Sequence, residues 1–130
     1  MNHTLTADSL MHKALCACDS AQLLLTTKDA DGACNRAYYA MFDAARAALI
    51  ISGVTLPIYK THNGLISAFS LHLVKNGAFP TELGRALNRA EEMRLVADYT
   101  GDSIELVDAE KIVEQAVTFV ASIRAQLFST

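Results

Sequence analysis

The stretch 33–51, ACNRAYYAMFDAARAALII, decides how this chain folds. It is rich in Ala, Leu, Met, Phe and Tyr and contains neither Gly nor Pro, which predicts one uninterrupted helix. Because a helix turns by about 100° per residue, its strongly polar side chains fall within a wedge of roughly 100°. A helix that is apolar on its other sides has to be buried. We therefore expect a polar groove or an interface at the wedge, which carries Asn35, Arg36, Tyr39, Asp43 and Arg46.

Four further helices are predicted around this one. Apolar residues at helical spacing indicate helices from Thr6 or Asp8 to 26, from a Thr61 cap to 76, over 81–98 and over 108–128. Asp31 is expected to cap the central helix. Short connections between amphipathic helices produce antiparallel neighbours. The chain is therefore expected to be a single all-α domain over 1–130, an up-and-down bundle of about five helices with its core at about 8–125.

Composition and net charge exclude a disordered protein and argue against a protein that binds nucleic acid through its overall charge. The chain is 52% hydrophobic and 19% charged, which excludes wholesale disorder. A formal net charge of −3 argues against bulk electrostatic capture of nucleic acid, so any RNA contact would need a local basic site. Apolar Leu95 and Val96 on the outer side of the fourth helix predict a homodimer.

The expected compartment is the cytoplasm. No basic segment followed by an apolar core marks a signal peptide, and the arginines and aspartate within 33–51 argue against a membrane span. Cys16, Cys18 and Cys34 do not have zinc-site spacing, so we interpret them as small buried thiols. Neither a metal site nor a cofactor is expected.

Arg94, Asp98 and Tyr99 are the candidate catalytic residues. Arg94 and Asp98 lie four positions apart and face the same way, at the edge of the buried side of the fourth helix, with Glu91 beside them. The alternative interpretation is an ordinary ion pair within one helix. The functional interpretation gains support from the wedge, since two helices that each carry arginine and tyrosine can form one anion site.

Lys60 and His62 form a second candidate, because a helix that starts beside a lysine and a histidine can bind phosphate. The alternative is that Thr61 is only a cap and His62 an ordinary bundle histidine. Gly-rich phosphate loops, HExxH, paired Glu-x-x-His motifs and a Ser or Cys nucleophile beside a histidine base are missing from the sequence. Metal-free phosphodiester chemistry would then need an acid or base and an arginine.

Three separated motifs resemble a known family. The runs NRAYYAMFDAARAAL (35–49), KTHNGL (60–65) and LGRALNRAEEMRLVADY (83–99) look like the HEPN domain family, close to its small stand-alone prokaryotic proteins that carry an Arg-x-x-x-Asp-Tyr motif. This resemblance implies a dimeric helical bundle. It also implies a role as the toxin of a toxin–antitoxin pair whose partner is a minimal nucleotidyltransferase.

Many HEPN proteins are metal-independent endoribonucleases, whose motif is an arginine followed four to six residues later by a histidine. The motif arginine corresponds to Arg94, but Tyr99 stands where the histidine would be. A tyrosine with an ordinary pKa near 10 is a poor base at neutral pH. The tyrosine that partner enzymes modify in related toxins corresponds here to Gly101. Tyr99 stays a candidate target of such modification.

Three hypotheses follow. The first is a non-catalytic module that binds a nucleotide, RNA or a nucleotidyltransferase partner. The second is a metal-independent endoribonuclease toxin, with Arg94, Asp98 and Tyr99 at a dimer groove that Asn35 and Arg36 line. The third is a structural dimer whose wedge is a satisfied polar network.

Overall fold

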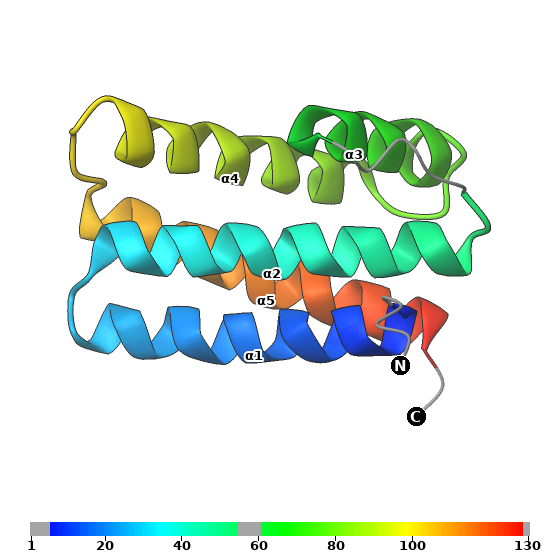
Figure 1. Cartoon of the computed structure of the whole chain (residues 1–130), viewed down its shortest axis with the longest axis horizontal. Coiled ribbons are helices and arrows are strands. Elements are labelled where there is room, and N and C mark those ends of the chain that lie inside the picture. The colour runs from blue at the N-terminus through cyan, green and yellow to red at the C-terminus, as the bar shows by residue number, and fades with distance from the viewer. Residues whose placement is uncertain (1–5, 55–60, 129–130) are drawn as a thin grey trace, which may run out of the picture.

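The computed structural model describes residues 6–54 and 61–128, and all of its regular elements are helical. The predicted fold class, an all-helical bundle of about five helices, is confirmed (Figure 1). The elements are α1 (Ala7–Thr26), α2 (Ala30–Ile51), α3 (His62–Phe69) with its π-helical continuation η2 (Ser70–Val74), α4 (Thr81–Tyr99) and α5 (Leu106–Leu127).

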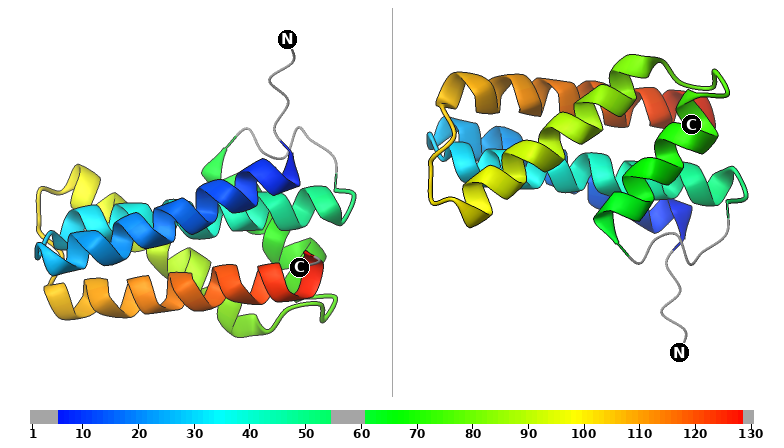
Figure 2. Two further views of the ribbon diagram at one scale, coloured as in Figure 1. Left: turned by 90° about the horizontal axis from the view of Figure 1, so that it is seen from below. Right: turned by 90° about the horizontal axis from the view of Figure 1, so that it is seen from above.

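Helix α2 is the centre of the bundle, as its apolar circumference predicts. It packs against α1, α3, α4 and α5, and its closest partner is α1. Buried alanines on both helices allow this close approach, among them Ala14, Ala17, Ala37 and Ala44. Figure 2 shows α4 crossing obliquely over α2 with α3 beside it, on the side of α2 away from α1. This crossing brings side chains of α2, α3 and α4 together.

The cap of α2 differs from the sequence expectation. Asp29, not Asp31, accepts a hydrogen bond from the Gly32 amide at 2.9 Å and caps the helix. Lys28 adopts a positive φ of 63° immediately after α1, so the chain turns early enough for α2 to begin at Ala30. A Cβ at Gly32 would collide with the Asp29 carboxylate. Asp31 instead accepts from the Ile104 amide at 2.8 Å and joins the start of α2 to the segment before α5.

The expectation of three buried thiols is wrong for Cys16. Residues two apart on a helix are separated by about 200°, so Cys16 and Cys18 cannot both face the core. Cys18 and Cys34 are buried, and burial is the main cause that raises the pKa of each thiol to about 11. Cys16 is exposed, with its sulfur 3.6 Å from His12 Nε2.

The outer side of α4 exposes apolar side chains, as expected. Leu95 is 37% and Val96 44% exposed, whereas Leu83, Leu87 and Ala90 face the core. The homodimer that these side chains imply stays a prediction. Among the residues that the structure describes, none of the helices is long and apolar enough to cross a membrane.

The cap assignment can be tested by substitution. Asp29→Ala is expected to lower the free energy of unfolding by about 1 kcal/mol, because the Gly32 amide loses its acceptor. Asp29→Asn, which keeps a side-chain acceptor, should remain close to the wild type in urea denaturation followed by circular dichroism. Equal losses in both variants would argue against the cap.

Candidate functional site

Tyr38 lies at the centre of a polar cluster between α2, α3 and α4. Its side chain is fully buried, and its hydroxyl oxygen lies 2.6 Å from Nδ1 of His62. The guanidinium carbon of Arg94 lies 4.9 Å from the centroid of the Tyr38 ring, a cation–π contact. We call Tyr38, His62, Glu91, Arg94 and Asp98 the arginine cluster.

Arg94 is held by two carboxylates of its own helix. Its Nη2 donates to Glu91 Oε1 at 2.9 Å, and its Nη1 donates to Asp98 Oδ2 at 3.2 Å. The side chains of Arg94 and Glu91 are only 12% and 10% exposed, whereas that of Asp98 is 42% exposed. Burial by itself would lower the pKa of Arg94, but the hydrogen bond and charge of Glu91 outweigh it and raise the pKa. The guanidinium is therefore a permanent cation inside the bundle.

His62 is the first residue of α3, and its ring packs on aromatic side chains of α2. It stacks on Phe42 with ring centroids 4.6 Å apart, and Thr61 caps the helix as predicted. Its Nδ1 lies 3.7 Å from Glu91 Oε2, which is beyond hydrogen-bond distance but within electrostatic range. The structure thus brings the sequence candidates His62 and Arg94 into one cluster. Lys60 lies outside the described residues.

The Tyr38 hydroxyl stays protonated in this environment. Burial raises the pKa of Tyr38 well above its usual range, and the neighbouring Glu91 carboxylate raises the pKa further. Tyr38 is therefore a neutral phenol, and its hydroxyl shares a hydrogen bond with Nδ1 of His62.

Tyr38 was absent from the residues proposed from the sequence, and Glu91 was named there only as a neighbour of Arg94. On the helical wheel Tyr38 falls in the apolar arc of α2, where it is indistinguishable from a core residue. One signal was available: a buried tyrosine hydroxyl needs a polar partner, and such a partner had to come from another helix.

The polar wedge of α2 turns mostly toward α1. Three of its members, Arg36, Tyr39 and Asp43, line a groove of about 340 Å³ that His12, Lys13 and Cys16 complete. Burial raises the pKa of Asp43, while nearby Arg46, Lys13 and Arg36 act to lower it. The groove is therefore a second polar feature, separate from the arginine cluster.

The wedge as a whole connects only partly to Arg94. Tyr39 reaches the cluster through an edge-on contact with His62, their ring centroids 6.0 Å apart. Arg46 pairs with Asp43 at 3.7 Å and lies over the Phe42 ring. Asn35 is half-buried at the side of α2. The wedge and Arg94 thus share aromatic neighbours and not one continuous groove.

Tyr99 does not join Arg94 in this chain. It is 79% exposed at the last residue of α4. A step of five residues rotates a helical position by about 140°, whereas the four-residue step to Asp98 rotates it by about 40°. Asp98 therefore reaches the guanidinium, and Tyr99 points to solvent beside Leu95.

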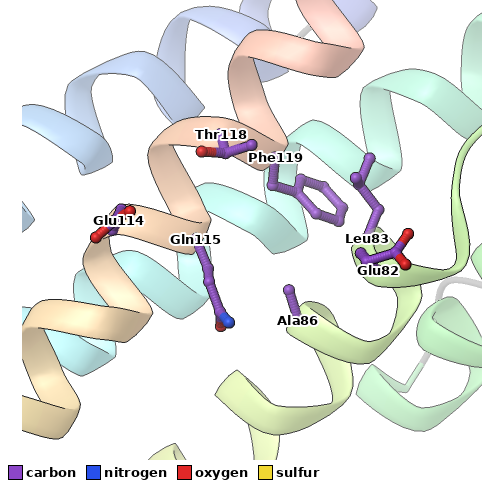
Figure 3. A pocket seen from close by; sticks show the side chains of 7 residues that line it. All are labelled: Glu82, Leu83, Ala86, Glu114, Gln115, Thr118 and Phe119. Atoms are coloured by element: carbon purple, nitrogen blue, oxygen red, sulfur yellow. The ribbon is translucent and has the colours of Figure 1, made fainter.

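A cavity of about 150 Å³ lies between α4 and α5 (Figure 3). Leu83, Ala86 and Phe119 line it together with the carboxylates Glu82 and Glu114. Among residues 6–54 and 61–128, no arginine, lysine or histidine lines this cavity. Its two carboxylates, Glu82 and Glu114, repel phosphate, which disfavours nucleotide or RNA in this cavity.

The burial of the ion pair predicts a large effect of one substitution. Arg94→Ala should lower the free energy of unfolding by about 3–5 kcal/mol, because it leaves the Glu91 carboxylate buried without its partner. Denaturant unfolding measures this change. The control is Arg89→Ala, because Arg89 is an exposed residue of the same helix. This control should change the free energy of unfolding by less than about 0.5 kcal/mol. An Arg94→Ala protein more stable than the wild type would mean that the cluster is strained for function.

Comparison with known proteins identifies the family. Residues 7–126 match the HEPN domain. The chain is 34% identical over 113 residues to a UPF0332 protein of Gloeobacter violaceus, which covers 85% of this chain and 87% of the relative. It is also 34% identical over 108 residues to a protein of Methanocaldococcus jannaschii named "Putative toxin", over 83% of this chain and 78% of the relative. The resemblance carried by the three motifs is thereby confirmed, and the chain belongs to the HEPN domain family.

Proposed function

We propose that this chain is the toxin-like member of a protein pair, a HEPN module that binds a nucleotide or RNA at the arginine cluster. Its proposed partner is a minimal nucleotidyltransferase acting as antitoxin. The family and the relatives named as toxins support this assignment. The observation that carries it is a permanent cation, Arg94, held over the Tyr38 ring, whose hydroxyl is hydrogen-bonded to a histidine of another helix, His62.

The charges of the cluster define how an anion would bind. Arg94 stands between two carboxylates, so a phosphate has to compete with one of them. Glu91 is nearly buried and bonded to Arg94 through two nitrogens, whereas Asp98 is 42% exposed and bonded through one. We therefore propose that the ligand phosphate displaces Asp98 and takes its place on Nη1.

Removing the competing charge should strengthen binding. Asp98→Asn is expected to lower the Kd for a single-stranded RNA or a nucleotide severalfold. The phosphate then no longer has to break a charge-assisted hydrogen bond between Nη1 of Arg94 and a carboxylate. Fluorescence anisotropy with labelled RNA measures this, and Asp19→Asn on α1 is the control that makes the same change in net charge. Equal gains in the two variants would indicate a general charge effect, and weaker binding by Asp98→Asn would contradict the displacement.

A second candidate function is metal-independent cleavage of RNA. The sequence argued against it because α4 lacks the motif histidine. The observation that favours it is His62, which α3 brings into the arginine cluster. An arginine to stabilise charge and a histidine to transfer a proton are the groups that this chemistry requires.

Cleavage can be tested with the purified chain free of any partner. On this second candidate, total RNA is cut in the presence of EDTA, and Arg94→Ala abolishes the cutting, because the phosphate loses its cation. Arg89→Ala should cut like the wild type. Circular dichroism at the assay temperature must show that the Arg94→Ala protein is folded. RNA left intact by the wild type would refute cleavage, and the non-catalytic binding module would remain the proposed function.

The proposed assembly is a homodimer with a nucleotidyltransferase partner. The exposed strip of Leu95, Val96 and Tyr99 on α4 supports an interface on this side of the bundle. A gene for a small nucleotidyltransferase beside the gene for this chain would support the pairing. If the protein neither binds nor cuts RNA, the structural dimer is the remaining hypothesis.

A further inference from the structure

We propose that the groove between α1 and α2 binds a phosphate monoester, held by Lys13 of α1 and Arg36 of α2. The groove has a volume of about 340 Å³, and its lining includes His12, Lys13, Cys16, Arg36, Tyr39 and Asp43. Arg94 lies in the separate arginine cluster between α2, α3 and α4. The inference therefore goes beyond the proposed function and does not depend on it.

Lys13 and Arg36 face the groove without a carboxylate partner. Among residues 6–54 and 61–128, neither cation has an aspartate or glutamate oxygen within ion-pair distance. Lys13 is exposed, but Arg36 is half-buried and has lost part of its hydration without gaining a counter-ion. A guanidinium in this condition is stabilised by an anion that enters the groove and donates its negative charge to the pair.

The carboxylate that lines the groove is already paired elsewhere. Asp43 Oδ1 lies 3.7 Å from Nη1 of Arg46, on the next turn of α2. Burial raises the pKa of Asp43, and the charges of Arg46, Lys13 and Arg36 act in the opposite direction, so all three cations lie around this one carboxylate. Arg46 neutralises Asp43, and the charges of Lys13 and Arg36 are left over.

The excess of positive charge favours one class of ligand. A phosphate monoester carries about two negative charges at neutral pH, which matches the two unpaired cations, whereas each internal phosphodiester of RNA carries one. Arg36 can donate two parallel hydrogen bonds to phosphate oxygens, and Lys13 adds a compact charge from the other helix. The half-buried Tyr39 has a hydroxyl without a hydrogen-bond partner among the described residues, and this hydroxyl can donate a further bond.

The thiol of Cys16 provides a reporter inside the groove. Cys16 is exposed and lines the groove, with its sulfur 3.6 Å from Nε2 of His12. Cys18 and Cys34 are buried, and burial is the main cause that raises the pKa of each to about 11. Because the thiolate is the reactive form, a neutral alkylating agent such as iodoacetamide should modify Cys16 first.

Alkylation tests where the ligand binds. Saturating inorganic phosphate, at an ionic strength held constant with sodium chloride, should slow the modification of Cys16 severalfold, as followed by mass spectrometry. The bound dianion covers the thiol and disfavours its thiolate. In Arg36→Gln the same phosphate concentration should leave the rate unchanged. A wild-type rate that phosphate does not alter would overturn the site.

Substitutions test the two cations. In an NMR titration with inorganic phosphate, Arg36→Gln should raise the Kd about tenfold, because the paired donors to the phosphate oxygens are lost. Lys13→Gln, at an exposed position where the fold is not at risk, should raise the Kd severalfold. The matched control is Arg89→Gln on α4, which removes the same charge from an exposed side chain and should leave the Kd unchanged. Equal losses in all three variants would indicate a general charge effect and overturn the proposal.

Comparison of inorganic phosphate with AMP identifies the source of the phosphate group. Tighter binding by AMP that is lost in Arg36→Gln would assign a nucleotide to the groove, and equal binding would assign the phosphate group alone. Binding of both probes that Asp98→Asn strengthens and Arg36→Gln leaves unchanged would belong to the arginine cluster. That result would support the proposed function and contradict this inference.

Discussion

The burial of α2 is the constraint on which the rest of the structure depends. Twelve of its 22 residues are buried, so water has to be excluded from it on nearly every side. Transfer of apolar area from water at about 25 cal/mol per Å² provides the driving force. The four other helices meet this requirement by packing around α2. Because α3 and α4 cover the same helix, the first turn of α3 and the second half of α4 meet over Tyr38.

Charge balance inside the arginine cluster limits what the site can do. One guanidinium faces two carboxylates, and the nearly buried Glu91 accepts hydrogen bonds from Nε and Nη2 of Arg94 with both of its oxygens. The more exposed Asp98 is the contact that a ligand can replace at the lowest cost. A site of this kind differs from an open cationic patch. On the proposed function, the ligand phosphate substitutes for a carboxylate at this site, and such binding does not need a strongly basic protein, in agreement with the net charge of −3.

Sequence reasoning succeeded where a single helix determines the answer. Helical spacing predicted the number of helices, the central place of α2 and the pairing of Arg94 with Asp98, since all of these depend on local periodicity. It was wrong for the cap of α2, where the positive φ of Lys28 shifts the helix start, and for the burial of Cys16. Tyr38 escaped notice because a buried tyrosine and a core residue occupy the same arc of a helical wheel.

By itself the sequence determined the fold class, the family motifs and the position of the cation at Arg94. These follow from the spacing of apolar residues and from the order of the motifs along the chain, which need no knowledge of tertiary contacts. Only the tertiary structure decided which side chains surround that cation. Arg94 and His62 lie 32 residues apart in sequence, and the oblique crossing of α4 over α2 brings them together while it leaves Tyr99 in solvent. The angle of that crossing depends on how the side chains of several helices pack against one another, so it cannot be predicted from any single segment of the sequence.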